Sequence, residues 1–491
     1  MHLVLIRDDL RVHDHQALLT AVNSARKNDN RVVALYIYDE ESPGIRPLGS
    51  AVKWWLHQSL KRFTQSLNKL NIPFLIARGQ TADVVQALAI ELNITHLHWN
   101  RRYAQAERAV DNQLKEWAKT KDIKTQDYTG FLLHEPEKIH PTSGYFYKVF
   151  TPFWKAISVQ DFRTPLPAPS SLEVENQPLP NMDHLSFLSS LDELNLIPLG
   201  SHWTQKLEKQ WNPGEQTAIE TSQNFAESIL LHYNERRDYP SKKATSCLSP
   251  YLRFGEISPA TVLRHMHEAN PDGTPDTAHF ASEIGWREFC WHLTFHNSHL
   301  YQREFKPDWM KFPWRRENQA RDTDEIISWQ QGRTGIPLVD AGMRELWSTG
   351  FMHNRVRMVV ASFLTKNLLI DWRVGEQWFW DTLVDADLAS NPCNWQWIAG
   401  CGADASPYFR IFNPSLQSKK YDEDATYIQR WVPELRTINQ NIIRGDDINA
   451  SELSSINYPE PLVDLRDSRQ RALMTYKSFK MRNSRDKDMD A

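Results

Sequence analysis

The sequence is poor in the features that mark membrane, secreted and metal-cluster proteins. Its 491 residues include four scattered cysteines and no C-x-x-C pair, which disfavours a disulfide framework, a zinc site and an iron–sulfur cluster. The longest apolar runs, such as MVVASFL (358–364), are far too short to span a membrane. We therefore expect no metal site and no membrane contact, in a reducing, cytoplasmic setting.

Two further signals are missing. The chain has no G-x-G-x-x-G and no G-x-x-x-x-G-K-[ST], so neither standard phosphate-loop signature is present. Its formal net charge of −4 gives no overall basic excess. Any contact with nucleic acid must therefore come from a local basic patch.

The first 130 residues alternate short apolar runs with helical patterns. The helical patterns include 50–67 and 81–92. The near-continuous apolar runs expected of buried parallel strands lie at 3–7, 31–39, 74–79 and 95–100. Alternation of this kind predicts a doubly wound α/β domain with a parallel sheet.

The pattern changes after residue 130. A proline-rich, polar stretch (about 160–200) reads as a long linker packed on the surface, and from about 213 helical segments replace strands. The sequence predicts an α/β domain joined by a long linker to an all-α domain. The predicted bounds are 1–130 for the α/β domain, 131–205 for the linker, 206–475 for the helical domain and 476–491 for a charged tail.

Three stretches of the helical part carry candidate chemistry. Asn354 and Met358 are four residues apart and share a helix face, although any amphipathic helix would show the same spacing. EIGWREF places Glu283 near Trp286, either a carboxylate held beside an indole or an ordinary helix surface. The hydroxyls of TSCLS (245–249) precede a helix start, where they could hold a phosphate or simply cap the helix.

Taken together, the motifs point to one family. In order they are YNERRDYP, TSCLSPYLRFG, EIGWREF, GRTGIPLVDAGMRELWSTGFMHNRVRM, DWRVGE, DADLASN, NWQW and PYFRIFNP. This series resembles the photolyase/cryptochrome family along almost the whole chain, and is most similar to cyclobutane pyrimidine dimer photolyases of the microbial, class I type. The α/β front and helical rear match that family's two domains in order and size.

The resemblance implies one FAD, held in a U-shaped form inside the helical domain. It places Asn391 against flavin N5 and Arg357 beside a carboxylate. Phe280 stands where some relatives carry tryptophan. The implied FAD-binding residues are Tyr233, Thr245, Ser246, Cys247, Leu248, Ser249, Phe280, Arg357, Asp385, Asp387 and Asn391.

The resemblance also implies the substrate residues. Animal-type (6-4) photolyases carry histidines at the positions of Asn354 and Met358, and plant cryptochromes carry aspartate at Asn354 and tyrosine at Trp397, which favours dimer repair here. The implied catalytic residues are Glu283, Asn354 and Met358. The implied DNA-binding residues are Arg237, Glu283, Trp286, Asn354, Arg355, Trp397, Arg410 and Gln417, with Lys419 and Lys420 on the same rim.

Two auxiliary features follow from the same resemblance. The resemblance implies that Trp395, Trp372 and Trp314 relay electrons to the surface. The alternative for Trp314 is that it is only a packed aromatic residue at the surface. Glu107 matches a position that contacts methenyltetrahydrofolate in folate-binding members. Because Ala106 and the segment 44–56 depart from the folate pattern, a deazaflavin or an empty site is the alternative to folate.

The resemblance implies light-driven repair of cyclobutane pyrimidine dimers in UV-damaged DNA by electron transfer from reduced FAD, that is, a deoxyribodipyrimidine photo-lyase. The alternatives are a blue-light cryptochrome with little or no repair and a light-independent flavin electron-transfer protein. The short stretch after YPEPLVDL (458–465) favours repair over signalling. We expect a cytoplasmic monomer that is associated with the nucleoid when bound to DNA.

Overall fold

The computed structural model describes residues 1–491 apart from 173–178, 199, 316–319, 406–408, 445–455 and 490–491. The chain divides into two compact units. Unit 1 comprises Met1–Tyr147, Thr151–Leu231 and Ser246–Ser298. Unit 2 comprises Lys148–Phe150, His232–Thr245 and His299–Ala491. Unit 1 thus contains the predicted α/β domain together with helices from the predicted helical domain. The domain bounds given above remain a prediction.

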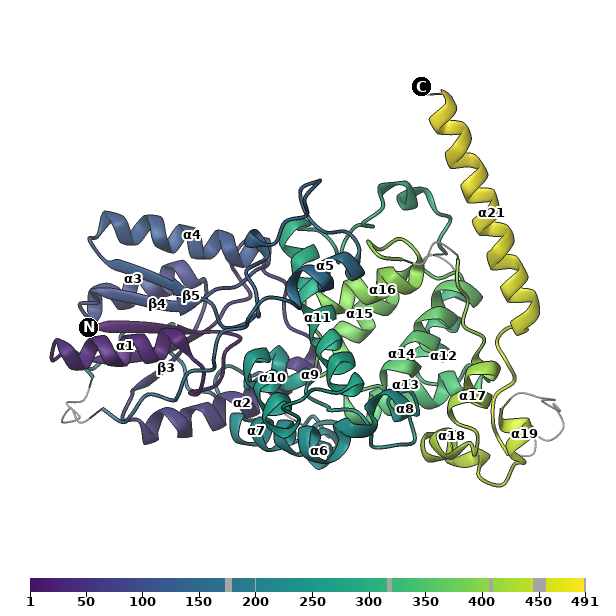
Figure 1. Ribbon diagram of the computed structural model, residues 1–491, viewed down its shortest axis with the longest axis horizontal. Coiled ribbons are helices and arrows are strands. Elements are labelled where there is room, and N and C mark those ends of the chain that lie inside the picture. The colour runs from purple at the N-terminus through teal and green to yellow at the C-terminus, as the bar shows by residue number, and fades with distance from the viewer. Residues whose placement is uncertain (173–178, 199, 316–319, 406–408, 445–455, 490–491) are drawn as a thin grey trace. The chain divides into compact units, whose positions relative to one another are not determined.

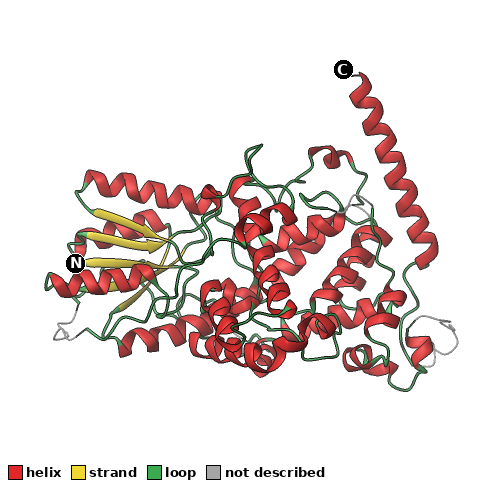
Figure 2. Cartoon of the chain, in the orientation of Figure 1, coloured by secondary structure: helices red, strands yellow, loops and turns green. Residues whose placement is uncertain are grey.

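Unit 1 is built on a five-stranded parallel sheet (Figure 2). The strands are β1 (His2–Ile6), β2 (Val32–Tyr38), β3 (Phe74–Arg78), β4 (His96–Asn100) and β5 (Lys124–Tyr128). Their order is β3-β2-β1-β4-β5, and every neighbouring pair is parallel. The predicted doubly wound α/β fold is therefore confirmed, and the strand order reverses between β1 and β4.

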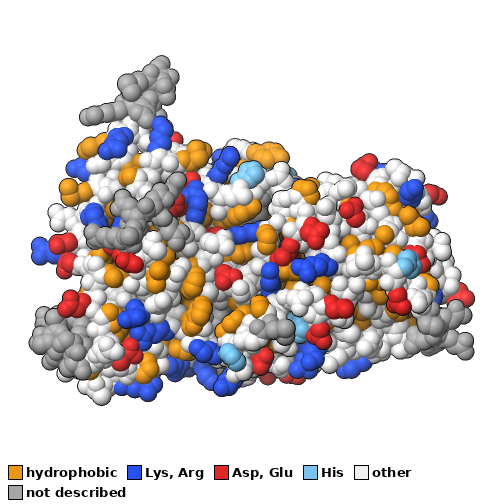
Figure 3. Space-filling model, turned by 180° about the vertical axis from the view of Figure 1, so that it is seen from behind, with side chains coloured by type: hydrophobic (Ala, Val, Ile, Leu, Met, Phe, Trp, Pro, Cys, Tyr) orange, Lys and Arg blue, Asp and Glu red, His pale blue; other side chains and the backbone are white. Residues whose placement is uncertain are grey.

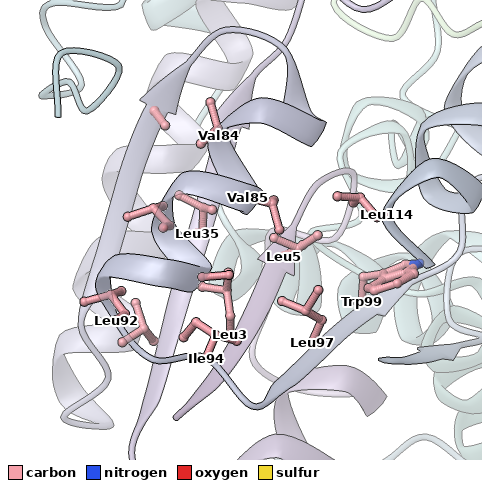
Figure 4. Close-up of a cluster of buried hydrophobic side chains, with 14 of the residues drawn as sticks. Leu3, Leu5, Leu35, Val84, Val85, Leu92, Ile94, Leu97, Trp99 and Leu114 are labelled. Carbon is pink, nitrogen blue, oxygen red and sulfur yellow. The ribbon is translucent and has the colours of Figure 1, made fainter. Parts of the chain in front are cut away.

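The sheet owes its position in the core to apolar side chains on both of its faces. All five residues of β1 are buried, and Leu5 pairs in register with Leu35 of β2 and Trp99 of β4. Figure 4 shows Leu3, Leu5, Leu35 and Leu97 of the sheet in one cluster with Val84 and Val85 of a flanking helix. The flanking helices are α1 (Gln16–Lys27), α2 (Ser50–Lys69), α3 (Thr81–Glu91) and α4 (Gln105–Thr120).

The predicted linker packs back onto unit 1. Leu172 N donates to Leu70 O (3.0 Å), and Ser189 N donates to Ile76 O (3.0 Å). Arg26 Nη1 donates to the hydroxyl of Ser170 at 2.6 Å. These bonds confirm a segment that lies on the surface of the α/β domain.

Helices form the rest of the described chain (Figure 1). Up to residue 296 they are η1 (Pro136–Lys138), α5 (Phe150–Ile157), α6 (Thr204–Gln210), α7 (Glu215–Asn224), η2 (Phe225–Ile229), η3 (Leu230–His232), α8 (Tyr233–Arg236), α9 (Ser249–Arg253), α10 (Pro259–Ala269) and α11 (Pro275–His296). After it they are η4 (Pro307–Lys311), α12 (Ala320–Gln330), α13 (Pro337–Thr349), α14 (Asn354–Ser362), η5 (Phe363–Asn367), α15 (Trp372–Thr382), α16 (Ser390–Ala399), α17 (Pro414–Tyr421), α18 (Thr426–Trp431), η6 (Pro433–Leu435), α19 (Gln440–Ile443) and α21 (Leu465–Met489).

Helix ends follow local chemistry. Ser258 caps α10 by accepting a hydrogen bond from Thr261 N at 3.1 Å, and Pro259 occupies the first turn. Gly350 ends α13 in the left-handed conformation (φ 65°) that glycine adopts without strain. Helix α21 continues to Met489, through most of the predicted charged tail at 476–491.

Across the residues that the structure describes, no helix is long and apolar enough to cross a membrane. Nor do three or more His, Cys, Asp or Glu side chains in these residues gather where they could hold a metal ion.

Candidate functional site

Four of the predicted FAD-binding residues lie on or near α14 and α16 of unit 2. Arg357 Nη2 lies 2.9 Å from Asp385 Oδ2, and its Nε donates to Met352 O at 2.7 Å. The structure thus contains the expected pairing of Arg357 with a carboxylate. Asp387 Oδ1 accepts from Ala389 N at 2.8 Å and from Ser390 N, which fixes the first turn of α16.

Asn391 has its amide group oriented by a neighbour that the sequence did not single out. Its Nδ2 donates to Glu376 O (3.0 Å) and to Glu376 Oε1 (2.9 Å). Because both amide hydrogens face Glu376, the side chain presents Oδ1, which accepts no hydrogen bond from the described residues. Glu376 ends the motif DWRVGE, and only the fold brings it to Asn391.

Asn354, Met358 and Trp397 occupy two helices of unit 2 that pack together. Asn354 is the exposed first residue of α14, and Met358 follows one turn later, half-buried. Trp397 lies on α16, which contacts α14. The two tryptophans of NWQW differ in burial, since Trp397 is half-buried whereas Trp395 is 3% exposed.

A basic and aromatic surface of unit 2 surrounds Arg355. We call Arg237, Tyr239, Arg355, Lys420 and Tyr421 the unit 2 patch. The Arg355 guanidinium pairs with Asp238 and lies 4.5 Å from the centre of the Tyr421 ring, over which Lys420 also lies at 5.0 Å. Tyr239 and Tyr421 meet edge to face at 5.9 Å. Cations interleaved with aromatic rings suit a strand of nucleic acid.

Three further predicted DNA-binding residues lie near that surface in the chain. Arg410 is exposed and lies 4.7 Å over Phe412. Gln417 and Lys419 are half-buried on α17, whose N-terminus is capped by Asn413. Tyr239 and Tyr421 were missed by the sequence analysis, because nothing in their local sequence pairs a residue at 239 with one at 421.

The predicted residues of unit 1 include three on α11. Phe280 is buried and packs on Phe225 with ring centres 4.5 Å apart. Glu283 is half-buried, with Oε1 3.6 Å from His279 Nε2, and Trp286 packs edge to face on Phe289 at 5.9 Å. The Arg287 guanidinium donates to Phe131 O (3.0 Å) and lies 3.4 Å from Glu288.

The predicted phosphate residues fall on both units. Tyr233 and Thr245 belong to unit 2, with Arg237 4.9 Å over the Tyr233 ring. Ser246, Cys247, Leu248 and Ser249 belong to unit 1 and lead into α9. Cys247 is left-handed (φ 52°), and Leu248 N donates to the Ser246 hydroxyl at 3.4 Å, so this turn is held by its own side chains.

The three predicted relay tryptophans are buried in unit 2. Trp372 is fully buried and Trp314 is 8% exposed, and neither indole N–H has a hydrogen-bond partner. The ring neighbours of Trp395 are Trp329 and Phe379. Among the described residues no ring contact joins Trp372 to Trp395 or Trp314, so a relay in this order would need steps longer than ring contact.

Glycines permit two of these tryptophan-bearing helices to pack. A Cβ on Gly375 of α15 would lie 2.1 Å from the Trp395 ring. In EIGWREF, a Cβ on Gly285 would lie 2.4 Å from the Trp154 ring of α5. These two motif glycines are therefore explained by close packing of an indole on a helix.

Glu107, the predicted antenna residue, lies in a crevice of unit 1 at the carboxyl ends of β1 and β4. Ligands of doubly wound folds bind at this point of strand reversal. Here the crevice is filled: Arg7 Nη1 and Arg102 Nη2 lie 2.8 and 3.1 Å from Asp111 Oδ1, and Glu107 Oε2 accepts from Ala104 N at 3.3 Å. Its volume of about 10 Å³ admits no more than about one water molecule.

Known proteins match this architecture over its full length. Residues 2–170 match the family described as DNA photolyase, and residues 280–478 match the FAD binding domain of DNA photolyase. A deoxyribodipyrimidine photo-lyase of Agrobacterium fabrum is 42% identical, covering 97% of this chain and 98% of the relative.

Two solved structures indicate which class of photolyase the chain resembles. A bacterial class III photolyase from Agrobacterium tumefaciens superposes with a TM-score of 0.90 at 41% identity, over 98% of both chains. A cryptochrome of Synechocystis sp. PCC6803 gives 0.84 at 30% identity, over 97% of this chain and 99% of its own. The expected class I type is thereby corrected, because the more similar of these two is a class III photolyase. The chain belongs to the photolyase/cryptochrome family.

Proposed function

We propose that this protein is a deoxyribodipyrimidine photo-lyase that repairs cyclobutane pyrimidine dimers in DNA with light. The observation that carries the proposal is that unit 2 combines the Arg357–Asp385 pair and Asn391 of the FAD-binding region with the unit 2 patch. Arginine and lysine beside tyrosine rings suit the phosphates and bases of a nucleic-acid strand, which supports a nucleic-acid substrate.

The residues of unit 2 suit the ring system of FAD. When bound and reduced, FAD supplies the electron that light drives into the dimer. Asn391 presents an acceptor oxygen, which suits the N5–H of a reduced flavin, and Glu376 holds its amide in that orientation. Arg357 offers positive charge that Asp385 keeps in place. Tyr233, Thr245, Ser246–Ser249, Phe280 and Asp387 complete the proposed set.

The proposed substrate residues combine stacking with hydrogen-bond donation. A dimer must leave the duplex to be repaired, and its weakened pairing lowers that cost to about a few kcal/mol. Trp286 and Trp397 offer flat walls, each worth about 1–3 kcal/mol by stacking. The Asn354 amide donates to the pyrimidine carbonyls as they gain negative charge, and Glu283 is proposed as the second hydrogen-bonding group there. Met358 fills the remaining space with a polarisable side chain.

The remaining assignments complete the proposal. Trp395, Trp372 and Trp314 carry electrons from the surface to oxidised flavin. Glu107 contacts a second chromophore, methenyltetrahydrofolate in preference to a deazaflavin, although the crevice beside it needs rearrangement to admit one. The protein acts as a monomer in the cytoplasm, on nucleoid DNA.

Signalling is the second candidate, favoured by the likeness to the Synechocystis cryptochrome. One experiment separates the two functions. Purified, chemically reduced protein is illuminated with an oligonucleotide that contains one thymine dimer, and the restored base absorbance is read. Repair at many turnovers per protein supports a photo-lyase, whereas bound dimer that is never repaired supports the cryptochrome.

The same assay tests Glu283. Glu283→Ala should lower repair per absorbed photon while the Kd for damaged DNA stays within a few-fold, because the hydrogen bond strengthens only as charge develops. Glu283→Gln, which puts an amide N–H donor in place of the carboxyl group, is the matched control and should recover part of the loss. Equal yields in the parent protein and Glu283→Ala would remove the carboxyl from the chemistry.

A further inference from the structure

Helix α21 carries positive charge that the rest of the chain lacks. Its segment 465–483 holds six Lys and Arg and one Asp, whereas the whole chain has a net charge of −4, leaving −9 for the remainder. Figure 1 shows α21 as one long helix that leads to the C-terminus. In Figure 3, Lys and Arg side chains are spread over the face shown, among Asp and Glu side chains.

One face of α21 lines a groove of unit 2 with a volume of about 910 Å³. The groove residues recur every three or four positions along the helix, so they form a single face. They are Asp467, Gln470, Arg471, Met474, Thr475, Ser478, Phe479, Arg482 and Asn483, opposite Lys311 and Pro313. Three cations, four neutral hydrogen-bonding side chains and one carboxylate thus face the same space.

The groove is fixed before any ligand arrives, because a neighbouring face of α21 is anchored in unit 2. Ser468 and Ala472 are buried, and Asn367 Nδ2 donates to the Ser468 hydroxyl at 2.8 Å. Phe479 packs against Trp309 and Phe312 with both ring centres 5.2 Å away. A ligand would therefore meet preordered helix side chains along about four turns.

The chemistry of the lining favours a phosphodiester backbone. Arg and Lys together with Ser, Thr, Asn and Gln are the side chains that contact phosphate and sugar oxygens in protein–DNA complexes. The apolar lining consists of Pro313, Met474 and Phe479, of which Met474 is exposed and Phe479 is buried. Asp467, at one end of the groove, is its single repulsive group.

We propose that this groove binds the phosphate backbone of duplex DNA as a second contact, separate from the lesion. The inference rests on the proposed function, because it takes DNA as the substrate. Each phosphate contact lowers the slope of log K against log salt by about 0.9 and is worth roughly fivefold in affinity at 0.15 M salt. The groove should therefore act only on DNA long enough to reach it.

Two charge-matched double variants test the proposal. Ser478→Asp/Arg482→Gln lowers the net charge of the groove by two. Arg469→Gln/Lys477→Gln lowers the net charge of α21 by the same amount at exposed positions outside the groove. Binding is measured at 0.15 M salt to dimer-containing duplexes of about 10 and about 40 base pairs, which span roughly 34 and 136 Å of backbone. Thermal unfolding checks that both variants fold.

We expect the groove variant to bind the long duplex about tenfold more weakly than the parent, with unchanged binding and repair of the short one. The control should stay within twofold, because screening at this salt extends only about 8 Å. Equal losses of affinity for the long duplex in both variants, or no loss in the groove variant, would overturn the proposal that the groove binds DNA. Neither result would affect repair of the short duplex. Failure of the parent to bind the short duplex would instead overturn the proposed function.

Discussion

Two arginine clusters, one in each unit, show how the same side chain serves different ends. In unit 1, Arg7 and Asp111 are each 9% exposed and Arg102 is 13% exposed, and both guanidiniums face the same carboxylate. In unit 2, Arg355 is 18% exposed, its partner Asp238 is 32% exposed, and the guanidinium lies over a tyrosine ring. An arginine buried against a buried carboxylate holds a fold together, whereas one at the edge of water can exchange its partner for a phosphate.

The largest effect should come from removing the shared carboxylate of unit 1. Asp111→Ala leaves two buried guanidiniums unpaired, which should cost about 3–5 kcal/mol in the free energy of unfolding. Guanidinium chloride titration measures it. Asp238→Ala is the matched control in unit 2 and should cost less than about 1 kcal/mol, because its pair is partly hydrated. Similar losses in the two variants would erase the distinction between the clusters.

Acid should weaken unit 1 through its stacked histidines. Burial lowers the pKa of His2 to about 4 and that of His98, which also faces His2 and His96, to about 3. In the unfolded chain these histidines have a pKa of about 6.5, so below that pH they bind protons that the folded state does not bind. The free energy of unfolding therefore falls between pH 6.5 and 4. The loss is on the order of 3 kcal/mol for one such histidine.

The free energy of unfolding at pH 7.5 and pH 5.0 measures the part of this loss that occurs above pH 5, about 2 kcal/mol for one such histidine. His98→Asn, which removes the titrating ring, is the comparison protein and should show a smaller difference between the two pH values. An equal pH dependence in the two proteins would place the acid sensitivity elsewhere.

In unit 2 the effect should appear in binding. Arg355→Ala should weaken DNA binding about fivefold at 0.15 M salt and reduce the salt slope by about 0.9, with little change in stability. Asp238→Asn should do the opposite, because it removes the carboxylate that competes with phosphate for Arg355. An unchanged slope in Arg355→Ala would exclude this residue from the DNA interface.

The smallest effect concerns the ring beneath the cations. Tyr421→Ala removes the surface over which Arg355 and Lys420 lie, at about 0.5–1 kcal/mol for a cation–π contact at an exposed site, or roughly two- to fivefold in affinity. Tyr421→Phe retains the ring and should bind as the parent does. Weak binding by the phenylalanine variant would point to the hydroxyl instead.

Much of the fold was predictable because its signals are local. Continuous apolar runs predicted β1 to β4, and Ser258, Pro259 and Gly350 are local signals of helix ends. Strand β5 was missed because KTQDY is polar and lies at the sheet edge, where only Tyr128 is buried. The helix after 475 was missed because its anchors, Tyr476 and Phe479, are outnumbered by charges.

The site was predictable only where a motif names a residue. Arg357 and Asn391 came from such motifs, but their partners Asp385 and Glu376 are joined to them by the fold. Tyr239, Tyr421 and the groove of α21 combine residues that are distant in the chain. No spacing rule connects Lys311 with Arg482.

The composition of unit 1 from separate chain segments has a consequence for synthesis on the ribosome. Trp55 Nε1 donates to buried Glu256 at 3.0 Å, and a Cβ on Gly255 would lie 2.0 Å from Asp8 O, so early and late segments close on each other. Unit 1 therefore cannot be complete until residue 298 has emerged. At about 5–20 residues per second, the nascent sheet waits some 8–30 s after residue 147 with part of its apolar surface uncovered, a window in which chaperones would act.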